Sequence, residues 1–176
     1  MRIITGKYKG RHFEVPRSFK ARPTTDFAKE NLFNVLNGYI DFDGARALDL
    51  FAGTGSITLE LLSRGCSRVI CVERDAFHYR VIEEFLYRLG DKNALPIRAD
   101  AFRFLSKARE KFDFIFADPP YILPNIPDIP DIVLEHDLLL PGGVFVLEHG
   151  KRDDFRNHPR FVEHRQYGSV NFSFFQ

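Results

Sequence analysis

The sequence of 176 residues lacks any long hydrophobic segment. No apolar run approaches the roughly 20 residues that a membrane-spanning helix needs. Residues 1–7 also lack the apolar core of a secretory signal peptide. We therefore expect a cytoplasmic protein with no membrane partner.

Cysteine and metal-binding patterns are equally scarce. Cys66 and Cys71 form neither a Cys-x-x-Cys motif nor a Cys/His cluster, and no His-Glu-x-x-His pattern occurs. We expect two reduced structural thiols and no metal site. Internal repeats and low-complexity tracts are missing too. The length and the 44% hydrophobic content suit one domain with a sizeable core.

The net charge is only +1, but it is unevenly distributed. Residues 1–22 hold seven lysine and arginine residues against one glutamate, a local charge of +6 that leaves −5 for the rest. A basic leader on an acidic body is typical of a chain whose end binds a polyanion. A solvated surface hairpin explains the same charges equally well.

Strand and helix patterns alternate along most of the chain. Strands are predicted at residues 46–51, 68–73, 94–99, 112–117 and 144–148, with helices at 26–37, 56–63, 76–89, 101–107 and 132–139 and a turn at 141–143. Two β-hairpins are predicted outside this series, at residues 2–15 and 161–174. The alternation predicts an α/β fold with a mostly parallel sheet flanked by helices on both faces. The first hairpin is expected as an edge ribbon outside the core.

A glycine turn follows the first predicted core strand. Gly53 and Gly55 let the backbone approach a ligand closely. A dinucleotide fingerprint would need a third glycine where Thr58 stands. Asp49 inside the strand would repel a pyrophosphate and instead suits an ammonium group. The turn therefore predicts a site for a ligand without phosphate.

Two further carboxylates close the next two strands. Glu73 stands where a carboxylate can accept hydrogen bonds from two ribose hydroxyls, or is a surface residue beside Arg74. Asp100 could accept a hydrogen bond from an adenine amino group, or merely cap the helix that begins at Ala101. A ligand with ammonium, ribose and adenine groups satisfies all three acids. S-adenosylmethionine fits this description better than NAD or ATP.

The tetrapeptide Asp118-Pro119-Pro120-Tyr121 follows another apolar strand. Methylation of an exocyclic amino group requires that its nitrogen be oriented toward the methyl donor. A carboxylate and a backbone carbonyl held by prolines can accept the two N–H bonds, so that catalysis is mostly positioning. Tyr121 would stack on a base that has left its helix. The alternative is a proline-stiffened loop with an Asp cap and a packed tyrosine.

Together these motifs resemble the ribosomal RNA small subunit methyltransferase D family, class I S-adenosylmethionine-dependent enzymes that modify guanine N2 in 16S ribosomal RNA. The resemblance rests on residues 2–10, 22–26, 30–34, 49–55, 72–75 and 118–121 and on Glu148. It implies a cofactor site of Asp49, Phe51, Gly53, Gly55, Glu73, Asp100 and Ala101, with Arg22, Thr24 and Thr25 folded over it. It implies that Asp118, Pro119, Pro120 and Tyr121 hold the guanine.

The resemblance also carries expectations about fold and partners. It implies a Rossmann-like methyltransferase domain at residues 23–176 with a mostly parallel seven-stranded sheet and a C-terminal antiparallel hairpin, preceded by a basic hairpin extension at 1–22. It implies action on ribosomal RNA in a partly assembled small subunit. We expect a monomer. One departure concerns the helix after Asp26, which often begins with basic residues in the family. Here Phe27 and Ala28 leave only Lys29, so we expect Lys7, Lys9 and Arg11 to contact more of the RNA.

Three other functions stay open at this point. The same tetrapeptide serves adenine and cytosine amino groups, so another RNA or DNA adenine is an alternative substrate. A catalytically silent RNA-binding module would fit the fold, but the intact Asp118 and glycine turn argue against it. A dehydrogenase is opposed by the missing third glycine.

Overall fold

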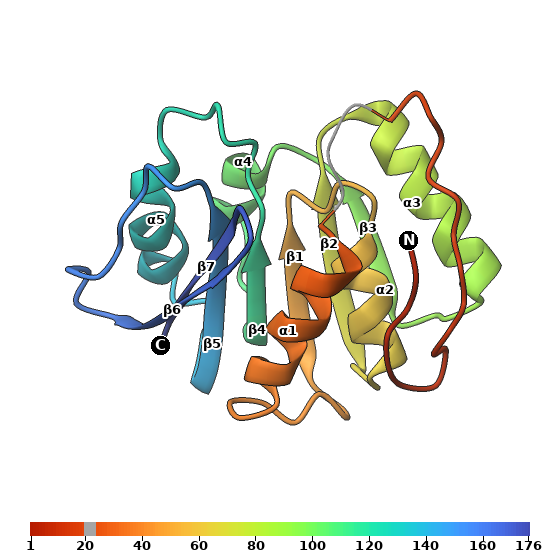
Figure 1. Cartoon of the computed structure of the whole chain (residues 1–176), viewed down its shortest axis with the longest axis horizontal. Coiled ribbons are helices and arrows are strands. Elements are labelled where there is room, and N and C mark those ends of the chain that lie inside the picture. Colours follow the sequence, from red (N-terminus) through yellow and green to blue (C-terminus); the bar gives the residue numbers. More distant parts are fainter. Residues whose placement is uncertain (20–23) are drawn as a thin grey trace.

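The computed structural model describes residues 1–19 and 24–176, and its strands form one mixed sheet (Figure 1). The strands are β1 (Arg46–Leu50), β2 (Arg68–Glu73), β3 (Ala94–Arg98), β4 (Phe112–Ala117), β5 (Leu139–His149), β6 (Phe161–Tyr167) and β7 (Val170–Phe175). Their spatial order is β3-β2-β1-β4-β5-β7-β6. The first five pair in parallel, whereas β7 runs antiparallel to both β5 and β6. The predicted Rossmann-like α/β fold is confirmed in outline.

Helices cover both faces of this sheet. They are α1 (Asp26–Leu36), α2 (Ser56–Ser63), α3 (Ala76–Leu89), α4 (Ala101–Leu105) and α5 (Ile129–Glu135), with a 3-10 turn η1 (Ile126–Asp128) before α5. One core cluster joins α1, α2 and α3 to one face of the strands, and a second joins α4 and α5 to the other. Alternate strand residues, such as Ala47 and Leu48, enter opposite clusters. No helix in the described part of the chain has the length and hydrophobicity to cross a bilayer.

Several predicted boundaries are wrong in the region after β4. Helix α5 begins at Ile129 rather than at residue 132, because Pro130 lies in its first turn, where a helix needs no N–H donor. It ends at Glu135 rather than at residue 139, which is already the first residue of β5. The turn predicted at residues 141–143 lies inside β5. The pairing of β4 with β5 shifts register between Phe112 and Phe114, and Gly142 takes φ 78°. The separate strand at 144–148 is therefore the second part of one longer, irregular strand.

The N-terminal leader is not the edge hairpin that its pattern predicts. Its two arms are joined by backbone hydrogen bonds of Met1 and Ile3 with residues 10–13 and by one antiparallel bridge, between Arg2 and His12, but they form no regular strands. The segment lies against α2 and α3 rather than at a sheet edge. Ile3 and Phe13 are buried in the main core. The buried Glu60 of α2 accepts hydrogen bonds from the backbone N–H groups of residues 4 and 5. The predicted domain boundary falls at residues 22–23, outside the described residues, and stays a prediction.

The leader approaches α2 most closely at Gly6. This residue has φ 90°, and a Cβ atom built there would overlap the carbonyl oxygen of Ser63. We expect Gly6→Ala to lower the free energy of unfolding by about 3 kcal/mol, because it combines a strained backbone with overpacking. Urea unfolding measures the loss.

A matched control is available at Gly10. It has φ 82°, but a Cβ atom there would meet nothing within 4 Å. Gly10→Ala should therefore cost only about 1 kcal/mol, the backbone part of the effect. Equal losses in the two variants would contradict tight docking of the leader on α2.

Cys66 and Cys71 are free and buried. Burial raises the pKa of each thiol to about 12. Both side chains therefore stay protonated and unreactive at neutral pH.

Candidate functional site

A cavity of about 1150 Å³ lies at the carboxyl ends of the parallel strands. These strand ends are at the top of the sheet in Figure 1. The predicted site residues that line it are Thr24, Thr25, Asp49, Phe51, Gly53, Glu73, Asp100, Ala101, Asp118, Pro119, Pro120 and Tyr121. Gly55, Lys7, Lys9 and Arg11 are not among its lining residues. Arg22 lies outside the described residues. The fold thus brings together segments that are far apart in the sequence.

The glycine turn has an unusual backbone. Phe51, Gly53 and Gly55 all have positive φ, of 60°, 54° and 75°. This conformation is easy for glycine but strained for phenylalanine. It directs the Phe51 ring toward Phe102, with ring centroids 5.9 Å apart, at the start of α4. Gly55 is the N-cap of α2, and a Cβ atom there would lie 3.3 Å from the side chain of Ile82.

The Glu73 carboxylate accepts hydrogen bonds from the backbone at this turn. Its Oε2 accepts a hydrogen bond from Gly53 N at 2.9 Å and its Oε1 accepts one from Asp75 N at 2.7 Å. The side chain is buried, so the alternative of a surface residue is wrong. Each carboxylate oxygen keeps a further lone pair for a ligand hydroxyl.

Two aromatic side chains that the sequence analysis did not identify lie beside Glu73. His78 lies 4.0 Å from the carboxylate, and Phe19 stacks on the His78 ring with centroids 3.8 Å apart. Both rings line the cavity. No sequence signal marks Phe19, because its partner is 59 positions away.

Asp49 is buried beneath the turn, with 1% exposure. Its Oδ2 accepts hydrogen bonds from Thr58 N at 3.1 Å and Thr58 Oγ1 at 2.6 Å. Burial raises the pKa of Asp49 to about 7, and the negative charge of Glu73 adds to the increase. A cation in the cavity would favour the ionised form. Thr58, which stands where a dinucleotide site would have glycine, holds this carboxylate in place.

Asp100 caps α4. Its Oδ1 accepts hydrogen bonds from Phe102 N at 3.0 Å and Arg103 N at 3.1 Å, and its Oδ2 lies 3.9 Å from Arg74. The capping alternative is therefore confirmed. Because Asp100 also lines the cavity, the contact with an adenine stays a prediction.

Asp118 lies at the end of β4, beside Glu148 at the end of β5. The parallel register pairs Ala117 with Leu147, so the two acids follow as neighbours on adjacent strands. Burial raises the pKa of Asp118 well above its usual value, and the charges of Glu148 and Asp49 add to the effect. Burial also raises the pKa of Glu148 to about 7. The cavity therefore holds acidic groups that can take up a proton near neutral pH.

Glu148 connects three parts of the site, a role that the sequence analysis did not assign to it. Its Oε1 accepts a hydrogen bond from the Tyr121 hydroxyl at 3.0 Å, and its Oε2 accepts one from Thr24 Oγ1 at 3.4 Å. Thr25, the next residue, caps α1 by accepting a hydrogen bond from Ala28 N at 3.1 Å. The sequence signal that could have identified this role is a carboxylate at the end of a predicted strand.

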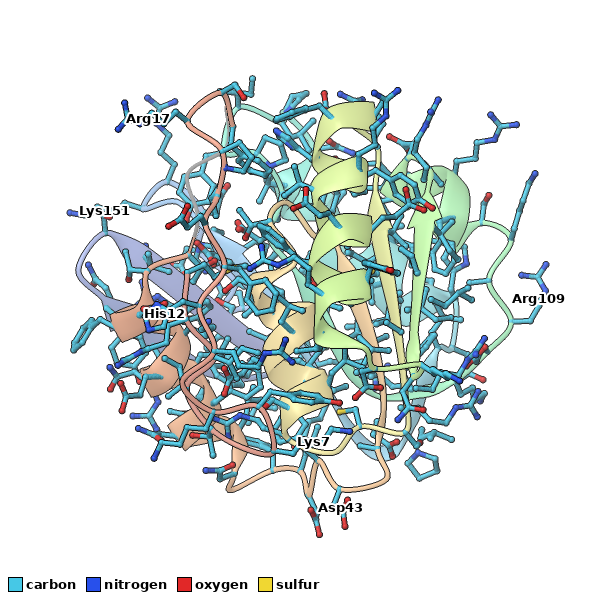
Figure 2. All side chains as sticks on the ribbon, turned by 90° about the vertical axis from the view of Figure 1, so that its right-hand side faces the viewer. Lys7, His12, Arg17, Asp43, Arg109 and Lys151 are labelled. Carbon is cyan, nitrogen blue, oxygen red and sulfur yellow. The ribbon has the colours of Figure 1, made fainter. Side chains whose placement is uncertain are left out.

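Lys7 and Arg11 of the leader lie far from this cavity. Lys7 forms an ion pair with Asp91 at 2.8 Å, and Arg11 donates hydrogen bonds to the carbonyls of Arg88 and Leu89. These partners are at the end of α3, whose first residue lines the cavity. At 1.5 Å per residue, the 14 residues of α3 span about 20 Å. Figure 2 places Lys7 at the lower end of the molecule. The contact of Lys7, Lys9 and Arg11 with RNA stays a prediction.

Lys29 is buried rather than surface-exposed. Its Nζ donates hydrogen bonds to the carbonyl of Arg2 at 2.6 Å and to Ser56 Oγ at 3.0 Å. Burial lowers its pKa, although the nearby Glu60 and Asp26 oppose the decrease. The one cation at the start of α1 therefore joins the leader to α2 and does not face a substrate.

Comparisons with known proteins show which family the chain belongs to. All of residues 1–176 match the sequence family described as "Conserved hypothetical protein 95". The "Putative rRNA methyltransferase YlbH" of Bacillus subtilis (strain 168) is 39% identical over 155 residues, which cover 86% of this chain and 83% of the relative. The "Ribosomal RNA small subunit methyltransferase D" of Escherichia coli (strain K12) is 37% identical over 121 residues, or 69% of this chain and 60% of that protein. The chain belongs to the ribosomal RNA small subunit methyltransferase D family.

Solved structures of similar proteins share the whole fold. The "Putative methyltransferase yhhF" from Escherichia coli superposes with a TM-score of 0.86 at 27% identity, covering 100% of this chain and 97% of that one. The "putative methylase HI0767" from Haemophilus influenzae has a TM-score of 0.79 at 28% identity, covering 99% and 97%. The family fold therefore includes the leader and the C-terminal hairpin.

Proposed function

We propose that this protein is an S-adenosylmethionine-dependent methyltransferase that modifies the N2 amino group of a guanine in small-subunit (16S) ribosomal RNA. The observation that carries the proposal is the cavity in which Asp118 and Tyr121 face the acids of the glycine turn. The names of the relatives support ribosomal RNA as the substrate. We further propose that the protein acts as a monomer on a partly assembled small subunit.

The residues present fit S-adenosylmethionine. Asp49 can pair with the ammonium group, Glu73 can accept from the ribose hydroxyls, and Asp100 with Ala101 and Phe102 can border the adenine. Three carboxylates would repel a phosphate-bearing cofactor. The cavity volume of about 1150 Å³ leaves room for a nucleobase beside the cofactor. When bound, the cofactor supplies an electrophilic methyl group.

The tetrapeptide would orient the acceptor nitrogen. The carboxylate of Asp118 and the carbonyl of Pro119 accept its two N–H groups, and the lone pair is then directed at the methyl group. Charge develops on this nitrogen during transfer, and a carboxylate already in place stabilises it without reorganisation. Asp118 then takes up the released proton, helped by its raised pKa. Tyr121, held by Glu148, supports the base by stacking.

Transfer of labelled methyl groups tests this function. The protein is incubated with labelled S-adenosylmethionine and small-subunit RNA, free or in partly assembled particles, from cells that lack the enzyme. We expect label in one guanine, which mass spectrometry of nuclease fragments locates as N2-methylguanine. Label in DNA adenine or in another RNA alone would overturn the substrate assignment. Cofactor binding without any transfer would indicate a silent RNA-binding module.

A further inference from the structure

The rim of the cavity carries exposed aromatic side chains. Phe27 is 66% exposed and Tyr121 is 48% exposed, and both line the cavity. Phe27 meets Tyr167 edge to face, with ring centroids 6.2 Å apart. Large apolar side chains that are exposed beside a concave site mark an interaction surface. These rings come from α1, from the loop after β4 and from the end of β6.

Phe27 is connected to the loop that contains Asp118 and Tyr121. It is the second residue of α1, two positions after the Thr25 cap. The preceding Thr24 donates to Glu148, which also accepts from Tyr121. Hydrogen bonds through Thr24 and Glu148 therefore link the chain that leads into α1 to Tyr121, which would contact the target base.

Among the described residues, the cations near Phe27 are engaged by other groups of the protein. The neighbouring Asp26 is acidic and lies 3.9 Å from both Arg2 and Lys29, and Lys29 is buried. The described residues in this part of the rim therefore offer little to attract a phosphate. An exposed ring without a nearby free cation suits a nucleobase, since bases stack on aromatic rings with little dependence on sequence.

Basic side chains occur on the far side of Tyr121. A Cβ atom at Gly150 would lie 3.5 Å from the Tyr121 ring, so the chain after β5 passes directly along that ring. Lys151 and Arg152 follow, are exposed, and form no salt bridge within the described chain. The neighbouring Asp154 is already paired with Arg156. Figure 2 shows Lys151 in the upper half of the molecule, away from Lys7.

We propose that the nucleotide next to the target base stacks on a platform formed by Phe27 and Tyr167, while Lys151 and Arg152 meet the RNA backbone beyond Tyr121. This inference rests on the proposed function and deepens it, because it places the RNA-binding surface at the rim of the cavity instead of on the leader. In this chain an aromatic ring takes the place of the basic residues expected at the start of α1. The RNA contact at this point is base stacking, and its affinity does not depend on salt concentration.

Direct RNA binding tests the platform. Affinity for small-subunit RNA from cells that lack the enzyme is measured by filter retention at several salt concentrations, beside the affinity for S-adenosylhomocysteine. Phe27→Ala should weaken RNA binding roughly 5- to 150-fold without changing the slope of log affinity against log salt. Phe27→Tyr should restore binding, and S-adenosylhomocysteine affinity should stay within twofold in both variants.

Two further variants separate stacking from charge. Replacing Lys151 and Arg152 by serine should reduce the salt slope by roughly 0.7 per contact. Tyr87→Ala removes a ring that is 88% exposed on α3 and is not among the lining residues of the cavity, so it should leave binding unchanged. It is the matched control for the loss of an exposed aromatic side chain.

Several results would overturn the platform. RNA affinity within twofold for Phe27→Ala would remove Phe27 from the interface, and a lost affinity for S-adenosylhomocysteine would place it in the cofactor site. A changed salt slope in Phe27→Ala would mean that the contact is not stacking. These outcomes are read from binding, so they stay distinct from a failure of methyl transfer, which would overturn the proposed function.

Discussion

Asp118→Ala is expected to abolish methyl transfer while leaving the affinity for S-adenosylhomocysteine within a few-fold. The carboxylate is the acceptor that would orient the attacking nitrogen and receive its proton, and no other side chain of the tetrapeptide can replace it. Loss of one prearranged electrostatic group in an active site lowers the rate by roughly 100- to 1000-fold. Because Asp118 lies at the end of β4 and not inside the core, the fold should persist.

Three measurements isolate the role of Asp118. Single-turnover transfer to small-subunit RNA gives the rate, calorimetry gives the affinity for S-adenosylhomocysteine, and urea unfolding gives the stability. Asp128→Ala is the matched control, because this aspartate is exposed on η1 and is not among the lining residues of the cavity. Transfer at the normal rate in Asp118→Ala would remove this residue from the mechanism.

Asp49→Asn is expected to stabilise the protein at pH 8 and to weaken cofactor binding. The pKa of Asp49 is raised to about 7 in the folded protein, whereas an unfolded aspartate titrates near 3.9. Between these values the folded state holds one proton more than the unfolded state, so stability falls as the pH rises from about 4 to about 7. The loss is at most about 4 kcal/mol. Asparagine cannot ionise, so the variant does not lose this stability as the pH rises.

The same substitution removes the partner of the ammonium group. Asparagine is nearly isosteric with aspartate, and its oxygen can still accept a hydrogen bond from Thr58. A charge-assisted contact would be lost, however, and we expect S-adenosylhomocysteine to bind roughly 10- to 100-fold more weakly. Stability and affinity should therefore change in opposite directions.

Urea unfolding at pH 5 and pH 8 measures the first effect. The wild type should lose more stability than Asp49→Asn over this interval. Part of the pH dependence should remain in the variant, because the pKa values of Glu148 and Asp118 are also raised. Asp128→Asn should behave like the wild type. Identical pH dependence in wild type and Asp49→Asn would show that Asp49 is already ionised in the folded protein.

Much of the fold follows from local patterns in the sequence. The parallel strands are short apolar runs, and each is followed by glycine, an acid or proline, so the order of elements and the acids at their ends can be predicted. The errors occur where tertiary contacts outweigh a local signal. The helix predicted from residue 132 begins at Ile129, with Pro130 in its first turn, and Gly142, predicted in a turn before a strand, forms an irregular point within β5.

The leader shows the same limit for charge. Its cations predicted an RNA-binding surface, which stays a prediction, and the structure shows that Lys7 and Arg11 contact the end of α3. A sequence count of charges does not distinguish a free cation from one that is paired within the protein. Buried Ile3 and Phe13 hold the segment on the core. Lys7 and Arg11 are thereby placed next to the end of α3.

The sequence by itself determined the α/β class, the glycine turn, the acids Asp49, Glu73 and Asp100, and the tetrapeptide that begins at Asp118, because each depends on neighbouring residues. Only the tertiary structure decided which distant groups meet these motifs. Glu148 joins Thr24, 124 positions earlier in the chain, to Tyr121, and Phe27 reaches Tyr167 at the rim. Such contacts depend on how the strands and helices pack together, and residue spacing along the chain does not encode them.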